Sequence, residues 1–330
     1  MAAKQGFRIK SLVPPVVVVA ALGWLSTVDV ELPDVFVAEQ IIELRDRFYD
    51  VAIPDDQVVW AVGKNGKIVR SDDRGETFRV QPTPTINHLH SIAAWDTQTA
   101  VVIGNEGETL HTADGGASWQ SVPAPLGDFA KKMFRAEIAP DGRVWATAEY
   151  GSILSSTDKG ETWTLVSGGD DVAWNDVAFA REGRVCVAGE FGQISCSDDQ
   201  GETWVAKETP LDSSLMAIAF NESGHGLAAG VDGHVISSSD DGETWVVVKS
   251  PTTKHLYGIA QNGNEWLAVG EKGALLLFDP VKDQWIEENL GSRGNVWYSG
   301  VQPGHGGIYL SGQKLALWKD GALKLFGRLK

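Results

Sequence analysis

Two histidines are spaced so that they could bind a metal ion together. His88 and His90 are separated by one residue, and alternate residues of a strand point to the same side of a sheet. A pair of imidazoles is only part of a metal site, and the other five of the seven histidines are scattered along the chain. We therefore predict that His88 and His90 pack at a surface or in a funnel, and that the protein uses neither a metal ion nor another cofactor.

Acidic turns that end in an aromatic residue recur along the chain and could bind calcium. One copy reads SSDDGETW at positions 238–245, and each copy offers one or two carboxylates. Calcium takes about six to eight oxygen ligands, more than such a turn supplies. We instead predict an architectural role, in which the hydroxyl and carboxylate groups bond the backbone of the turn, glycine supplies positive φ, and the aromatic ring packs between repeats. The aspartates are Asp73, Asp114, Asp158, Asp199 and Asp240, and the aromatic residues are Phe78, Trp119, Trp163, Trp204 and Trp245.

The spacing of these turns predicts the architecture. Successive aspartates are 41, 44, 41 and 41 residues apart, and a degenerate copy over 279–285 and a remnant over 319–321 continue the series. Each repeat contains an inner strand such as NDVAF, two strands joined by a glycine turn, and a fourth that begins at the aromatic residue. Repeats of about 40 residues with four strands are typical of propeller blades. The sequence therefore predicts an all-β, seven-bladed β-propeller over 48–330 with four-stranded antiparallel blades, whose inner strands begin near 48, 89, 133, 174, 215, 256 and 297.

The first 26 residues resemble a targeting segment. Lys4, Arg8 and Lys10 precede an uncharged run of 14 residues from Leu12 to Leu25, which suits a signal peptide better than a free-standing membrane span. The small residues near the end of this segment are scattered (Ala20, Ala21, Gly23 and Ser26) and form a poor cleavage site. Residues 1–26 could therefore be a cleaved signal peptide or an uncleaved anchor that associates with the inner membrane through residues 4–25. Both alternatives predict export to the periplasmic side of the inner membrane. A buried N-terminal strand or helix is the remaining alternative.

Residues 27–47 link this segment to the propeller. They could pair with the edge of the seventh blade and close the ring, although residues 323–326 could do the same. Part of this linker, residues 37–47, could form a short helix.

The charge and the cysteine content limit the function further. The chain carries a formal charge of −16, which should repel nucleic acid, so we expect no nucleic-acid partner. The only two cysteines, Cys186 and Cys196, lie on two strands expected to form a hairpin. They could form a cross-strand disulfide if the turn centres on Phe191, or they could remain reduced and pack as small apolar residues.

The acidic turns are similar to the Asp-boxes of bacterial-neuraminidase-type repeats. With the upstream pattern G-x-x-G-x-I-x-x-S and inner strands of the form D-V/I-A-F, residues 48–327 resemble the photosystem II stability/assembly factor family of seven-bladed propellers. The resemblance implies a non-enzymatic scaffold on the lumenal side of a membrane that helps to assemble a membrane complex. Some relatives from bacteria without photosynthesis are associated with transporters of the resistance–nodulation–division type.

The arginines favour a non-photosynthetic bacterial member of this family. No obvious counterpart of the arginine cluster of the photosynthetic members is present, because blades 3, 4 and 7 and their preceding loops contain only Arg135, Arg143, Arg181, Arg184 and Arg293. We therefore interpret the chain as a scaffold or accessory subunit that docks on an integral membrane complex such as a large transporter.

Sialidases share the Asp-box and provide an enzymatic alternative. Their catalysis needs three arginines for the substrate carboxylate and a tyrosine nucleophile with a glutamate partner. Tyr49, Tyr257 and Tyr298 lie on expected inner strands, but few arginines do, and no matched glutamate is evident. The arginine motif that opens sialidases is matched only by FRIK at 7–10, inside the targeting segment. A sialidase-like or glycan-binding protein that uses the funnel is therefore the second hypothesis, and we expect no enzymatic activity.

The loops that precede the inner strands should gather on the funnel face, where propellers usually bind partners. They are rich in basic and aromatic side chains, which dominate protein interfaces. The candidate binding residues are His88, His90, Lys131, Lys132, Arg135, Trp174, Lys254, His255, Tyr257, Arg293, Trp297 and Tyr298. The alternative for the aromatic members is that they wedge between inner strands.

Overall fold

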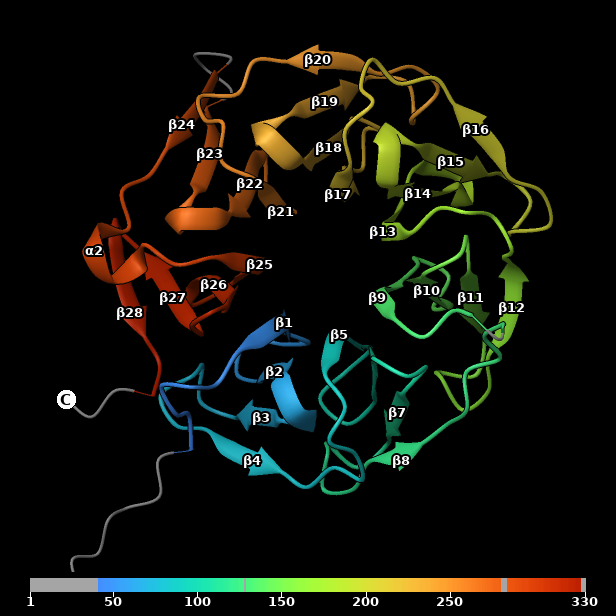
Figure 1. The fold of residues 1–330 in the computed structure, drawn as a ribbon. Coiled ribbons are helices and arrows are strands. Elements are labelled where there is room, and N and C mark those ends of the chain that lie inside the picture. The colour runs from blue at the N-terminus through green and yellow to red at the C-terminus, as the bar shows by residue number, and fades with distance from the viewer. Residues whose placement is uncertain (1–40, 128, 280–283, 328–330) are drawn as a thin grey trace, which may run out of the picture. The chain divides into compact units, whose positions relative to one another are not determined.

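The computed structural model describes residues 41–127, 129–279 and 284–327, which form seven four-stranded antiparallel sheets arranged around one axis (Figure 1). This confirms the predicted seven-bladed β-propeller. Each blade is built from one continuous stretch of chain, with its strands in sequence order from the axis outward.

The strands of the first four blades are β1 (Phe48–Ala52), β2 (Val59–Gly63), β3 (Ile68–Ser71), β4 (Arg79–Gln81), β5 (Leu89–Ala94), β6 (Ala100–Gly104), β7 (Thr109–Thr112), β8 (Gln120–Ser121), β9 (Met133–Ile138), β10 (Val144–Ala148), β11 (Ile153–Ser156), β12 (Thr164–Ser167), β13 (Trp174–Phe179), β14 (Val185–Gly189), β15 (Ile194–Ser197) and β16 (Val205–Lys207). Blades 5 to 7 comprise β17 (Leu215–Phe220), β18 (Gly226–Gly230), β19 (Val235–Ser238), β20 (Val246–Val248), β21 (Leu256–Asn262), β22 (Glu265–Gly270), β23 (Leu275–Asp279), β24 (Gln284–Glu287), β25 (Tyr298–Gly304), β26 (Gly307–Gly312), β27 (Ala316–Lys319) and β28 (Ala322–Leu325). A one-turn helix, α2 (Gly291–Gly294), precedes β25, and short 3-10 turns cover Lys64–Gly66, Arg181–Gly183, Glu190–Gly192, Val231–Gly233 and Glu271–Gly273.

Apolar residues on both faces of the blades hold the ring together. The second strands of blades 1 to 5 are buried at every residue, as in VWAVG of β2 and VCVAG of β14, and those of blades 6 and 7 are buried at all but their first residue. The buried apolar residues of the described chain form seven clusters, each of which spans two neighbouring blades, and the last joins blade 7 to blade 1. Burial from both sides explains why these strands are apolar throughout.

The Asp-boxes have the architectural role that the sequence predicts. In the third blade, Asp158 accepts hydrogen bonds from Ser156 Oγ at 2.7 Å and from the Thr162 amide and hydroxyl at 2.9 and 2.6 Å. Ser156 Oγ in turn accepts the Gly160 amide at 2.8 Å. The same bonds recur at Asp73, Asp114, Asp199 and Asp240. The aromatic residues Phe78, Trp119, Trp163, Trp204 and Trp245 all pack in or against the clusters between blades.

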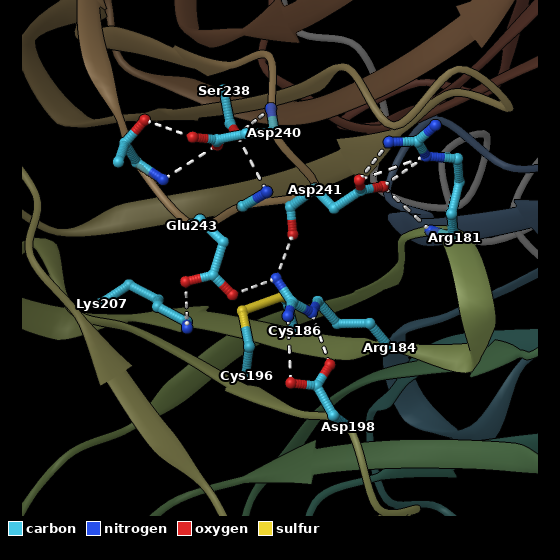
Figure 2. A network of polar contacts seen from close by, with 12 residues as sticks. Arg181, Arg184, Cys186, Cys196, Asp198, Lys207, Ser238, Asp240, Asp241 and Glu243 are labelled. Carbon is cyan, nitrogen blue, oxygen red and sulfur yellow. Dashed lines mark hydrogen bonds and ion pairs between the residues drawn. A yellow bond between two sulfur atoms is a disulfide. The ribbon is translucent and has the colours of Figure 1, made fainter.

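The Asp-box of blade 5 also joins blade 4 through ion pairs (Figure 2). Arg181 forms a two-pronged contact with Asp241, whose carboxylate Oδ1 lies 2.9 Å from Nε. Arg184 binds Asp198 through Nε and Nη2 at 2.6 and 3.0 Å, and its Nη1 reaches Glu243 of the next blade at 2.5 Å. Both arginines belong to blade 4, as the sequence predicts, and they connect this blade to blade 5. They do so on the face of the ring where the Asp-box turns lie, which we call the Asp-box face.

Cys186 and Cys196 form a disulfide between β14 and β15, where they are directly opposed. Phe191, with φ of 56°, lies at the centre of the intervening turn, as the disulfide alternative requires. Both cysteines are buried in the cluster between blades 4 and 5.

The C-terminal strand β28 forms the outer strand of blade 7, so this blade is complete without residues from the other end of the chain. Residues 41–47, which include the last part of the expected short helix, form bends and turns instead. The predicted targeting segment 1–26 and linker residues 27–40 lie outside the described residues. Within the described ranges, no helix combines the length and apolar character needed to cross a membrane.

Candidate functional site at the mouth of the central cavity

The second residue of every inner strand is turned toward the propeller axis by a β-bulge. The pairing of each inner strand with its neighbour shifts register at this residue, for example between Phe48 and Asp50 and between Trp174 and Asp176. Bulges commonly redirect a side chain in this way. The seven redirected residues line a central cavity of about 200 Å³, and they are Tyr49, His90, Phe134, Asn175, Met216, Tyr257 and Ser299.

Blades 1, 2 and 7 form an aromatic cluster beside this cavity, and two of its four members, Tyr49 and His90, line the cavity itself. The Tyr49 ring stacks on Trp297, with ring centroids 6.0 Å apart and planes 10° apart. His90 and His88 lie beside the same tyrosine, at centroid distances of 5.1 and 6.1 Å. All four side chains are half-buried. We call Tyr49, His88, His90 and Trp297 the mouth cluster.

The histidines are held by contacts within the protein. His88 Nδ1 accepts the Asn65 amide at 3.2 Å, and His255 Nδ1 accepts the Asp232 amide at 2.8 Å, so both bind the glycine turn of the preceding blade. His90 Nε2 lies 2.7 Å from Asn105 Oδ1. Burial lowers the pKa of His90 to about 4, so its imidazole is neutral at pH 7. In the described part of the chain, no group of three or more His, Cys, Asp or Glu side chains could hold a metal ion.

The predicted basic residues are not gathered into one patch. Lys131 pairs with Glu106 at 3.3 Å, and Lys254 pairs with Glu287 at 2.7 Å, in blades on different sides of the ring (Figure 1). Lys132 Nζ lies over the Phe134 ring, 4.8 Å from its centroid. Arg293 lies exposed in the one-turn helix α2.

Two predicted aromatic residues are core residues in the structure. Trp174 is 6% exposed and packs between blades 3 and 4, and Tyr298 is fully buried between blades 6 and 7. Tyr257, by contrast, lines the central cavity. The expectation that some aromatic residues wedge between blades thus describes Trp174 and Tyr298.

Arg135 is surrounded by three carboxylates near the axis. Its Nη1 lies 3.1 Å from Asp50, its Nε lies 3.4 Å from Asp176, and its Nη2 bonds Glu137. Burial alone would lower the pKa of Arg135, but the three carboxylates raise it. Burial raises the pKa of Asp176 to about 7 and also raises that of Glu137, and the attraction of Arg135 opposes both shifts.

Asp50 and Asp176 also tie neighbouring inner strands together. Asp50 Oδ2 accepts bonds from Ser91 Oγ at 2.7 Å and the Ile92 amide at 3.1 Å in blade 2. Asp176 Oδ2 accepts the Ile218 amide of blade 5 at 2.9 Å. Neither aspartate, nor Tyr49 and Glu137, is among the predicted binding residues. The recurring D-V-A of the inner strands was the available signal for the two aspartates.

The arrangement does not contain the arginine triad of a sialidase. Of the arginines in the described ranges, only Arg135 lines the central cavity, and it is engaged by Asp50, Glu137 and Asp176. Tyr49 and Tyr257 do reach the cavity, and burial raises the pKa of both phenols, which disfavours the phenolate.

Comparison of the sequence with protein-family models and with curated proteins gives no match. Among solved structures, the chain is similar to YCF48 bound to a D1 peptide, with a TM-score of 0.67 and 18% identity over 82% of this chain and 89% of that chain. YCF48 from Cyanidioschyzon merolae has a TM-score of 0.67 and 13% identity over 86% and 96% of the two chains. The WD40 propeller domain of Doa1 gives 0.65 and 14% identity over 83% and 92%. At these identities the likeness shows the propeller fold alone.

Proposed function

We propose that this protein is a non-catalytic scaffold that docks on an integral membrane protein complex through the face that carries the mouth cluster. The protein would assist the assembly or operation of this complex. The specific partner that we propose is a transporter of the resistance–nodulation–division type. The docking part of the proposal rests on one observation, the stacked Tyr49–Trp297 pair at the cavity.

The composition of the mouth cluster supports recognition of a protein segment. Trp, Tyr and Arg are the residue types that most often dominate binding energy at protein interfaces. The Asp-box face offers fewer free groups, because its charged residues Arg181, Arg184 and Asp241 already pair between blades. The structure of YCF48 with a D1 peptide indicates that a propeller of this fold can hold a peptide of another protein.

We further propose that the propeller lies on the periplasmic side of the inner membrane. The basic and apolar pattern of residues 4–25 supports export. The Cys186–Cys196 disulfide supports it independently, because disulfides persist mainly in oxidising compartments.

Affinity purification from detergent-solubilised membranes, followed by mass spectrometry, tests the proposal. The wild-type protein should recover an integral membrane complex, and Trp297→Ala should weaken its retention by about tenfold or more, as loss of an interface anchor does. Val246→Ala is the matched control, because Val246 is 61% exposed on the outer strand β20 of blade 5, away from the cluster. Equal retention of the complex by wild type and Trp297→Ala would contradict docking at the mouth cluster, and hydrolysis or tight binding of a glycan would favour the carbohydrate alternative.

A further inference from the structure

Two aromatic side chains are exposed at corresponding positions of blades 3 and 4. Tyr150 is 46% exposed and Phe191 is 62% exposed, each in the glycine turn between the second and third strands of its blade. Both have positive φ, of 54° and 56°, a conformation that is uncommon for bulky residues. The corresponding turns of blades 1, 2, 5 and 6 hold a polar or charged residue instead, and these residues are Asn65, Glu106, Asp232 and Lys272. Blades 3 and 4 therefore place a large apolar group in water where the other turns place a hydrophilic one.

The loop over residues 168–173 joins the two aromatic turns into one surface. At its start, the Gly169 amide donates to the Tyr150 carbonyl at 2.8 Å. At its end, the Ala173 carbonyl accepts the Glu190 amide, from the turn of blade 4, at 3.1 Å. The backbone of the loop thus holds the two turns in a fixed arrangement.

A third aromatic residue enlarges the apolar part of this surface. Phe129 is 76% exposed, and its ring centroid lies 6.1 Å from that of Tyr150. We call Phe129, Tyr150 and Phe191 the aromatic arc. It lies on the face that carries the mouth cluster, where glycine turns and the loops before inner strands meet, but across the ring from blade 7 (Figure 1). Exposed apolar groups that gather in one place commonly mark an interaction site.

The joining loop also supplies negative charge. Asp170 and Asp171 are exposed, and neither forms an ion pair with any residue that the structure describes. Glu190, next to Phe191, accepts the Ala173 amide at 3.0 Å and is likewise without a Lys or Arg partner in the described ranges. The aromatic arc is therefore flanked by three carboxylates that a basic partner would complement.

A cleft between blades 3 and 4 brings the negative charge beside an aromatic ring. It has a volume of about 460 Å³ and is bordered by Asp170, Asp171 and Trp204. Lys207 also borders it, but its Nζ pairs with Glu243 at 2.9 Å. An arginine side chain suits such a cleft, because a guanidinium group can stack on an aromatic face while it binds carboxylates.

We propose that the aromatic arc and the neighbouring carboxylates bind a protein segment that is both apolar and basic. Its apolar side chains would cover Tyr150 and Phe191, and an arginine would enter the cleft beside Asp170 and Asp171. This inference rests on the proposed function, since it adds a second contact for the partner that docks on this face and states the chemistry of that contact.

The charges favour this occupant over a lipid surface or a second copy of the chain. Protein surfaces that bind lipid headgroups are typically rich in Lys and Arg, whereas Asp170, Asp171 and Glu190 carry the opposite charge. Two copies that met symmetrically through this surface would bring the same carboxylates together, and like charges repel.

Fluorescence anisotropy on the purified full-length protein in detergent tests the proposal with synthetic peptides. The probe is a blocked, glycine-flanked peptide with the core Arg-Leu-Leu-Arg, and detergent micelles without protein serve as the blank. One comparison peptide replaces both arginines with glutamate, and another replaces both leucines with serine. Each comparison peptide should bind at least about tenfold more weakly than the probe. Equal binding of the three peptides would overturn the proposal.

A double variant locates the apolar contact. Tyr150→Asn with Phe191→Asn gives both turns the residue that blade 1 has at this position, Asn65, and asparagine tolerates positive φ. The free energy of unfolding should therefore not fall, while binding of the probe should weaken at least about tenfold. Val246→Thr with Val247→Thr is the control, because it replaces two exposed apolar side chains on the outer strand of blade 5 and should leave binding unchanged. Unchanged binding in the asparagine variant would contradict the proposal.

A second double variant locates the charged contact. Asp170→Asn with Asp171→Asn should weaken binding of the probe about fivefold, since it removes both exposed carboxylates at the cleft. Glu161→Gln with Glu202→Gln removes two exposed negative charges on the Asp-box face and should have no effect. Equal losses in the two variants would mean that the probe follows the overall charge of the protein, which would overturn the proposed site.

The other occupants give different results. Binding to phosphatidylcholine vesicles, or self-association in sedimentation, that the asparagine variant abolishes while the peptides fail to bind would assign the surface to lipid or to a second copy and overturn the inference. The docking proposal would then still be decided by Trp297→Ala, which lies outside the aromatic arc. Conversely, selective binding of the probe that is lost in both double variants would support the inference even if Trp297→Ala retains the membrane complex.

Discussion

Asp176 and Asp199 show how the same side chain serves two purposes in one fold. Asp176 is buried beside Arg135 at the axis, and burial raises its pKa to about 7. Asp199 lies in an exposed Asp-box, where hydrogen bonds from Thr203 and Ser197 lower its pKa to about 2. The difference arises because the first aspartate loses water around its charge, and the second gains donors that stabilise the charge.

These shifts predict opposite effects on the pH dependence of stability. The folded protein keeps Asp176 protonated between about pH 4 and pH 7 while the unfolded chain is ionised, so this residue reduces the free energy of unfolding as pH rises through that range. The size of the effect is about 1.4 kcal/mol per pH unit at most, and Glu137 contributes with the same sign. Urea unfolding of Asp176→Asn at several pH values should show a shallower decline between about pH 4 and 7.

The Asp199→Asn variant is the control for this experiment. The lowered pKa of Asp199 adds stability above about pH 4, which is lost as pH falls through about 2. Asp199→Asn should therefore lower the free energy of unfolding by a constant amount above about pH 4 and change the slope of the profile only in its acid limb. A decline between pH 4 and 7 that is the same in Asp176→Asn as in wild type would show that Asp176 is ionised in the folded protein.

At the scale of the blade, the repeated Asp-box pattern was the main sequence feature from which the fold could be predicted. Aspartates about 40 residues apart, each followed by an aromatic residue, were enough to predict the strands and their burial, because each Asp-box must turn the chain and pack against the next blade. The bulges of the inner strands were not predictable in this way. They leave no residue signature, since the redirected position holds Tyr49, Asn175, Met216 and others, so the sequence did not indicate which residues border the cavity.

Two glycines with nearly the same positive φ, Gly160 in the Asp-box of blade 3 and Gly142 in the turn between β9 and β10, separate the effect of backbone strain from that of packing. Gly160 has φ of +85°, and a Cβ there would lie 2.0 Å from Val101 Cγ1 in the preceding blade. Gly142 has φ of +88°, and a Cβ there would meet nothing within 4 Å. Gly160→Ala should lower the free energy of unfolding by about 1–3 kcal/mol more than Gly142→Ala, because only the first substitution also overpacks the core.

Chemical denaturation of the two variants under identical conditions measures this difference. Gly142→Ala measures the free-energy cost of positive φ alone. Its loss of stability is therefore subtracted from that of Gly160→Ala to give the cost of overpacking. Similar losses in both variants would mean that the Asp-box corner does not pack tightly on its neighbour, contrary to the contact with Val101.

At the scale of the molecule, the ring closes through packing and polar contacts between blades 7 and 1. Ser299 Oγ donates to the Tyr49 carbonyl at 2.9 Å, and the Tyr309 hydroxyl donates to the Arg74 carbonyl at 3.0 Å. Phe326 packs on Phe78 in the same interface, with ring centroids 5.2 Å apart. The sequence could not decide how the ring closes, because segments at either end had a suitable strand pattern.

The closed ring brings residues from blades 1, 2 and 7 together at one site. Tyr49 and Trp297 are distant in sequence but stack in space, and each comes from a segment before or within an inner strand. The predicted basic residues did not meet in this way, because Lys131 and Lys254 lie on different blades and already pair with glutamates. Loop position therefore predicted several residues of the mouth cluster, but it did not indicate which of the candidate residues contact one another.

Photo-crosslinking in intact membranes tests the central claim that this face docks a membrane protein. A photoreactive amino acid replaces Trp297 in one variant and Glu161, on the Asp-box face, in another. The account predicts a crosslinked integral membrane protein from position 297 and none from position 161. Crosslinks from position 161 with none from position 297 would contradict it.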